Sequence, residues 1–109
     1  MNYEYYRSLI GEYINGGRSA ERFLAEVGFP TELDLTADEL TKAVAIIAAA
    51  ADGNIQQLCQ LAELKMSEFA RKFGLPYRTA QDWCAGRRNP PEYLPILIGF
   101  ILVSELRHD

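Results

Sequence analysis

Apolar residues recur at helical spacing along most of the chain. They occupy positions 6, 9, 10, 13 and 14 near the start and positions 40, 43, 44, 47 and 51 further on, and each set is the spacing of one helix face. Turn residues separate such segments at 15–17, 28–30, 52–54, 74–76 and 86–91. The pattern predicts about seven helices and no strand. The predicted ranges are 3–15, 19–27, 37–51, 54–63, 66–73, 77–85 and 91–106.

Two helix starts carry capping signals. Thr36 with Glu39 forms the pattern of a capping box, and Ser19 is a candidate N-cap for the second helix. Since no internal repeat or linker interrupts the chain, we expect one all-α domain. In it, residues 1–53 form an N-terminal helical segment that packs against residues 54–109.

The composition is that of an ordinary globular protein. The chain has 109 residues, of which 49% are hydrophobic and 24% are charged, and this excludes a disordered or low-complexity chain. The start of the chain lacks a secretory signal pattern. The longest apolar run, 93–103, is much shorter than the roughly 20 residues of a membrane span. We therefore expect a soluble protein that has no contact with a membrane.

Few residues in the chain are suited to catalysis or metal binding. The only histidine, His108, lies one residue from the end. Cys59 and Cys84 have no neighbouring cysteine, so they predict neither a zinc site nor a disulfide framework, and a reducing cytoplasm fits them best. No glycine-rich phosphate loop or metal-ligand cluster is present. We expect no enzymatic activity, no catalytic residue, no cofactor and no metal.

Charge is distributed unevenly along the chain. The formal net charge is −4, and residues 1–64 hold ten carboxylates against four basic residues. Residues 65–89 instead hold six basic residues against two carboxylates. This asymmetry suggests an anion-binding end on an acidic body.

The basic stretch has the pattern of two short helices joined by a tight turn. Such a pair needs a small residue where the helices cross and a residue that tolerates positive φ in the turn, and Ala70 and Gly74 meet these demands. The apolar spacing then turns one set of residues inward: Phe69, Phe73, Leu75, Ala80 and Trp83. The opposite side of the second helix displays Tyr77, Arg78, Gln81 and Asp82.

In this stretch the sequence resembles the helix-turn-helix regulators of the lambda-repressor-like, xenobiotic-response-element type. The resemblance covers roughly residues 54–106, with residues 1–53 outside it. It rests on Ala70, Gly74, Leu75, Ala80, Trp83, Gly86, Arg88 and Pro90. It implies that helix 77–85 enters the major groove of duplex DNA.

That implied role assigns expectations to individual residues. Arg78 matches guanine, Gln81 suits adenine, and Tyr77 would reach a thymine methyl or a phosphate. Asp82 would either accept from cytosine or orient Arg78. Ser67, Arg87 and Arg88 are the candidate phosphate contacts.

The last helix is apolar almost all round. One stripe contains Leu94, Leu97, Ile98, Ile101 and Leu102, and a second contains Tyr93, Ile96, Phe100 and Val103. A helix of this kind is expected to be buried on all sides. The second stripe would be covered either by a second copy of the chain in a homodimer or by residues 1–53.

Two functions remain open at this point. The first is a small prokaryotic or phage-type transcriptional regulator that binds DNA through residues 77–88. The alternative is a protein-interaction module, such as an antitoxin or inhibitor, whose acidic residues 1–53 bind a protein partner. A positive face around Arg78, Arg87 and Arg88 favours the first function, whereas carboxylates from residues 1–53 covering it favour the second.

Overall fold

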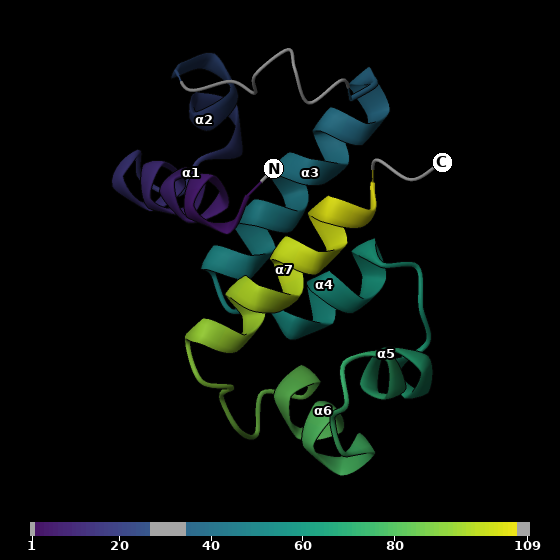
Figure 1. Ribbon diagram of the computed structural model, residues 1–109. Coiled ribbons are helices and arrows are strands. Elements are labelled where there is room, and N and C mark those ends of the chain that lie inside the picture. The colour runs from purple at the N-terminus through teal and green to yellow at the C-terminus, as the bar shows by residue number, and fades with distance from the viewer. Residues whose placement is uncertain (1, 27–34, 107–109) are drawn as a thin grey trace.

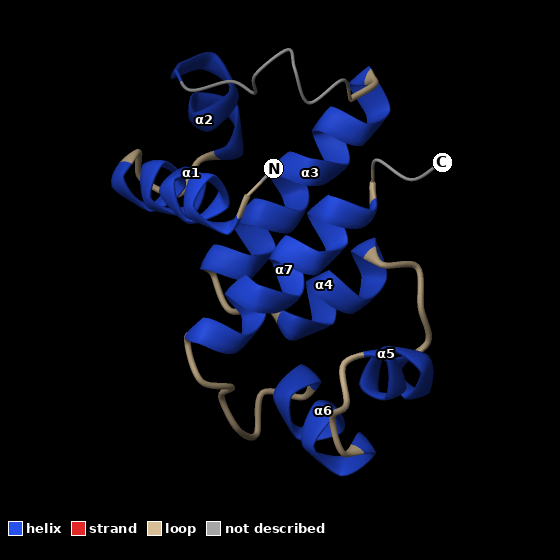
Figure 2. Cartoon of the chain, in the orientation of Figure 1, coloured by secondary structure: helices blue, strands red, loops and turns tan. Residues whose placement is uncertain are grey.

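The computed structural model describes residues 2–26 and 35–106, and the regular structure in these ranges is helical throughout (Figure 2). The helices agree with the predicted ranges to within two residues at each end, so the all-α prediction is confirmed. The end of the second predicted helix, the turn at 28–30 and His108 lie outside the described residues. The helices are α1 (Tyr3–Asn15), α2 (Ala20–Glu26), α3 (Ala37–Ala51), α4 (Ile55–Leu61), α5 (Met66–Lys72), α6 (Tyr77–Cys84) and α7 (Tyr93–Glu105).

Both predicted capping signals form hydrogen bonds. Thr36 Oγ1 accepts from the Glu39 backbone N–H at 3.1 Å, and Glu39 Oε1 accepts from the Thr36 N–H at 2.9 Å. Ser19 Oγ accepts from the Arg22 N–H at 3.2 Å. These side chains satisfy backbone donors that the first turn of a helix leaves unpaired.

Helix α3 lies at the centre of the fold, with α1, α2, α4 and α7 packed around it (Figure 1). Its sequence is rich in alanine, which favours the helix and lets neighbouring helices approach closely. The side chains of α3 that are buried point to more than one face: Ala43, Val44, Ile46, Ile47, Ala49 and Ala50. Residues 37–51 therefore form the common core for the N-terminal helices and for α4 and α7.

Within the single chain, helix α7 is buried on one side and exposed on the other, so packing inside the chain does not bury it on all sides. Pro95, Ile98, Gly99, Leu102 and Val103 are buried. A row at four-residue spacing stays in solvent, with exposed fractions of 60% for Tyr93, 38% for Leu97 and 41% for Ile101. Helices α3 and α4 contact only part of the circumference of α7.

Part of the second predicted stripe of α7 is covered within the chain. The Phe100 ring lies edge-on to the rings of Tyr3 and Tyr6, at centroid distances of 5.2 and 5.3 Å, and Val103 is buried. Phe100 thus follows the alternative in which residues 1–53 provide the cover, and Val103 is covered within the chain. Tyr93, from the same stripe, lies in solvent.

Candidate nucleic-acid interface

Helices α5 and α6 are joined by a tight turn centred on Gly74. This glycine has φ +68°, in the left-handed region, as the sequence predicted. The chain reverses through two backbone hydrogen bonds, Gly74 N–H to Arg71 O at 3.3 Å and Leu75 N–H to Ala70 O at 2.8 Å. Pro76 then precedes the first residue of α6, where its missing N–H costs no helical hydrogen bond.

The start of α5 is capped without a hydroxyl side chain. Glu68 Oε1 accepts from the backbone N–H of Lys65 at 2.9 Å. Ser67 lies inside the first turn of the helix and is exposed. Its hydroxyl is therefore accessible to a ligand.

The inward side of the pair holds α6 against α5 and α4. Phe69 and Ala80 are fully buried. Phe73, Leu75 and Trp83 are half-buried and pack against the core. The inward orientation predicted for these residues is confirmed, although Trp83 keeps part of its surface in solvent.

The outward side of α6 displays the residues predicted to read bases. Tyr77 has an exposed fraction of 50%, and Arg78 is exposed beside it in the first turn. Gln81 and Asp82, one turn later, are half-buried. The first turn of α6 is therefore its most accessible part.

Asp82 holds the loop that follows α6. Its Oδ1 lies 3.1 Å from Arg87 Nε, and its side chain is only 17% exposed. Its backbone oxygen also accepts from the N–H groups of Arg87 and Arg88, at 2.9 and 3.3 Å. Gly86, with φ +77°, allows the chain to turn back in this way. The carboxylate thus orients Arg87, and not Arg78, which was one of its two predicted partners.

The described residues of the acidic N-terminal segment do not cover the exposed arginines of this face. Within residues 2–26 and 35–106, Arg78 and Arg88 are exposed and form no ion pair. The carboxylates of the first 64 residues that form ion pairs do so elsewhere: Asp52 with Arg18, Glu26 with Arg22 and Glu63 with Lys42. Figure 1 shows α1 and α2 at the opposite end of the molecule from α5 and α6.

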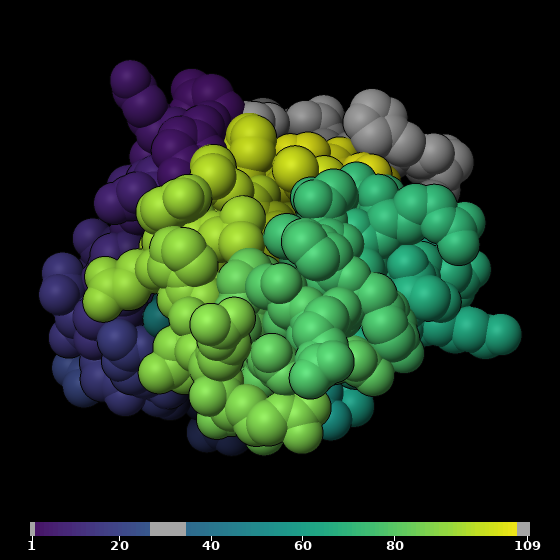
Figure 3. Space-filling view, turned by 90° about the horizontal axis from the view of Figure 1, so that it is seen from below, coloured from purple at the N-terminus to yellow at the C-terminus, as the bar shows by residue number. Residues whose placement is uncertain are grey.

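The surface seen in Figure 3 is formed mainly by α5, α6 and the loop after α6, drawn in green. The purple and blue atoms of the N-terminal helices lie at its left edge.

Two basic residues without an assigned role also belong to α5. Arg71 is exposed and forms no ion pair in the described part of the chain, and Lys72 Nζ lies 2.8 Å from Glu105 Oε2 on α7. The sequence could have indicated that Arg71 is exposed, because this residue lies off the helix face that carries Phe69, Ala70 and Phe73.

The cysteines add no reactive group to this face. The Cys59 thiol is buried and donates to Leu64 O at 3.3 Å, and Cys84 is half-buried. Burial raises the pKa of both thiols, which disfavours the reactive thiolate.

In the part of the chain that the structure describes, no cluster of three or more candidate ligands could hold a metal ion. None of the helices described there is long and apolar enough to cross a membrane.

Comparison with known proteins gave no match to a family model, to a curated protein or to a solved structure.

Proposed function

We propose that this protein is a small transcriptional regulator of prokaryotic or phage type that binds duplex DNA through a helix-turn-helix formed by α5 and α6. The observation that carries the proposal is the pair of exposed arginines, Arg78 and Arg88, without carboxylate partners in the described chain. Arg78 lies in the first turn of α6 and Arg88 follows its end, and the other side of this helix is packed into the core. An exposed helix with basic residues at its start and after its end fits the major groove and the adjacent phosphates. The protein would act in the cytoplasm, where its two cysteines stay reduced.

The residues divide by accessibility into base contacts and phosphate contacts. Tyr77 and Arg78 are the most exposed part of the groove-facing side and would read base edges, with half-buried Gln81 behind them. Arg88 and Ser67 would contact phosphates. Arg87 shares its charge with Asp82 and would contribute less to phosphate binding.

Selection from a randomised duplex pool at two salt concentrations tests the proposal. Arg78→Ala should cost about 1 to 3 kcal/mol on the preferred sequence and remove discrimination at one base pair. Arg88→Ala should weaken all duplexes about equally and lower the slope of log affinity against log salt by about one unit. Arg22→Ala, in α2, is the matched control and should change neither property.

The wild-type result decides between the two functions. Enrichment of a defined sequence supports the regulator. If the wild type enriches no sequence and binds only weakly at low salt, the regulator is excluded and the protein-interaction module becomes the better account.

A homodimer would place two copies of α6 on one duplex, and the exposed row of α7 is the available apolar surface for it. We propose that Tyr93, Leu97 and Ile101 form this contact, with Ile96 at its edge, because Phe100 and Val103 are covered within the chain. Leu97→Glu should give monomers without loss of helicity, since Leu97 is 38% exposed. Sedimentation that shows a monomeric wild type at high micromolar concentration would exclude the dimer.

A further inference from the structure

The first turn of α6 offers two accessible side chains for base contacts, Tyr77 and Arg78. Gln81 and Asp82, one turn later, are half-buried. The Asp82 carboxylate is also held by Arg87, with 3.1 Å between Oδ1 and Nε. In a helix-turn-helix the N-terminal residues of the second helix contact the base edges. If α6 enters the major groove, the first two side chains therefore carry its base preference.

The Arg78 guanidinium has no carboxylate partner among the described residues. Asp82 lies four residues further along α6, which is the spacing of a helical ion pair, but its carboxylate contacts Arg87 instead. Arg78 therefore keeps its planar set of donors for a ligand with two acceptors. Among the four bases, guanine alone presents two acceptors in the major groove, O6 and N7.

Tyr77 is the large hydrophobic residue of α5 and α6 that the structure leaves exposed, with an exposed fraction of 50%. The other residues on the outward side of α6 are polar. The apolar group that the major groove displays is the methyl group at C5 of thymine. Because 5-methylcytosine carries the same methyl group at the same position, the Tyr77 ring fits either methylated pyrimidine.

Tyr77 and Arg78 leave the same helical turn, so they reach base pairs that are close together. Consecutive Cα atoms lie about 3.8 Å apart, and one base step along a DNA strand is about 3.4 Å. Ala80, on the inward side of α6, is fully buried and holds the helix against the core. The two contacts therefore fall on neighbouring base pairs.

We infer that the first turn of α6 reads a guanine whose neighbouring base pair carries a methylated pyrimidine. Arg78 donates to O6 and N7 of the guanine, and the Tyr77 ring packs on the C5 methyl group of thymine or 5-methylcytosine. This specificity rests on the DNA binding proposed above, and it adds the chemical group that the protein recognises.

Selection from three randomised duplex pools tests this specificity. The first pool contains thymine, the second has uracil in its place and so lacks the methyl group, and the third combines uracil with 5-methylcytosine in place of cytosine. The wild type should enrich guanine beside thymine from the first pool. From the second pool it should keep the guanine, lose the preference beside it and bind about fourfold more weakly, in line with one methyl group less to bury. The third pool should give 5-methylcytosine at the neighbouring position.

Two variants separate the ring of Tyr77 from its hydroxyl. Tyr77→Phe is the matched control, because it keeps the ring, and it should retain the preference for thymine over uracil. Tyr77→Ala should remove this preference and keep the guanine. Since Tyr77 is 50% exposed, both variants should fold, and circular dichroism verifies this.

Equal affinity of the wild type for matched thymine and uracil duplexes would overturn the inference. Loss of the preference in Tyr77→Phe would also overturn it and would assign the hydroxyl to a phosphate. In both cases a sequence is still enriched, and the regulator function stands. A wild type that enriches no sequence from the first pool would instead overturn the proposed function and this specificity together.

Discussion

The Tyr6 hydroxyl occupies the space where a side chain at position 99 would begin. A Cβ placed on Gly99 would overlap Tyr6 Oη and lie 2.8 Å from the Ala50 Cβ. Helices α1, α3 and α7 therefore meet at a point where only glycine fits. The buried hydroxyl has no hydrogen-bond partner among the described residues.

Gly99→Ala should destabilise the protein, although alanine is the better helix former by about 1 kcal/mol. The added methyl group has to push α3 and α7 apart, and overpacking of this kind costs about 1 to 3 kcal/mol. We expect a net loss of up to roughly 2 kcal/mol in the free energy of unfolding, measured by urea denaturation.

The control for this prediction is Gly11→Ala in the middle of α1. A Cβ at Gly11 meets nothing within 4 Å, so this change should stabilise the protein by roughly 0.5 to 1 kcal/mol. Gains of equal size in both variants would show that the close approach at Gly99 does not exist.

Tyr6→Phe should leave stability unchanged or raise it by about 1 kcal/mol. The variant keeps the buried ring and removes a hydroxyl that is desolvated without a protein partner, which relieves a cost of this order. Thermal and urea denaturation measure the change. A loss of more than about 1 kcal/mol would mean that the hydroxyl forms a stabilising hydrogen bond.

Stability should fall as the pH rises above about 10. Burial raises the pKa of Tyr6 above its ordinary value, so the folded protein keeps a proton that the unfolded chain releases from about pH 10 upward. The contribution of protonated Tyr6 to the free energy of unfolding is fully present below about pH 10. Above this pH it is lost at up to about 1.4 kcal/mol per pH unit.

Comparison of two variants isolates the Tyr6 contribution to this pH dependence. Tyr6→Phe should show a shallower alkaline loss than the wild type. Tyr77→Phe, which alters a tyrosine that is 50% exposed, should follow the wild type. Identical pH profiles for all three proteins would contradict the assignment.

Asp82→Asn should affect all DNA duplexes alike. Because the carboxylate holds Arg87 and is 17% exposed, its neutralisation frees one positive charge and should raise affinity and the salt dependence together. The base preference should not change. A loss of discrimination at a single base pair would instead assign Asp82 to base reading.

Trp83→Ala should cost about 2 kcal/mol, less than Phe69→Ala at about 3 to 5 kcal/mol. Phe69 is fully buried, whereas Trp83 keeps part of its ring in solvent and loses less on truncation. Chemical denaturation compares the two variants. An unmoved midpoint for Trp83→Ala would place its ring outside the core and make it available for stacking on bases.

The local features of this protein could be predicted from the sequence because they depend on neighbouring residues. The capping box at Thr36 and Glu39 needs residues three positions apart, and the turn at Gly74 needs a residue that tolerates φ +68°. The inward side of α5 and α6 follows from 3.6-residue periodicity. The exposed side, with Tyr77 and Arg78, follows from the same periodicity.

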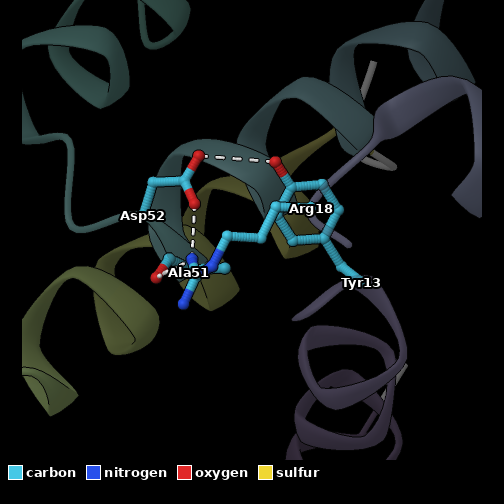
Figure 4. Close-up of polar contacts among 4 residues, drawn as sticks. All are labelled: Tyr13, Arg18, Ala51 and Asp52. Carbon is cyan, nitrogen blue, oxygen red and sulfur yellow. Dashed lines mark hydrogen bonds and ion pairs between the residues drawn. The ribbon is translucent and has the colours of Figure 1, made fainter. Parts of the chain in front are cut away.

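Only the tertiary structure decided which residues from distant segments meet. No spacing rule pairs Asp82 with Arg87 rather than Arg78, or places Tyr6 over Gly99. The composition of α7 predicts burial, but the amount of its surface that is covered depends on how α3 and α4 pack against it. The contact of Arg18 with Asp52 (Figure 4) likewise exists only because the segments that follow α1 and α3 converge. Such relationships arise from packing between helices, which local sequence patterns do not encode.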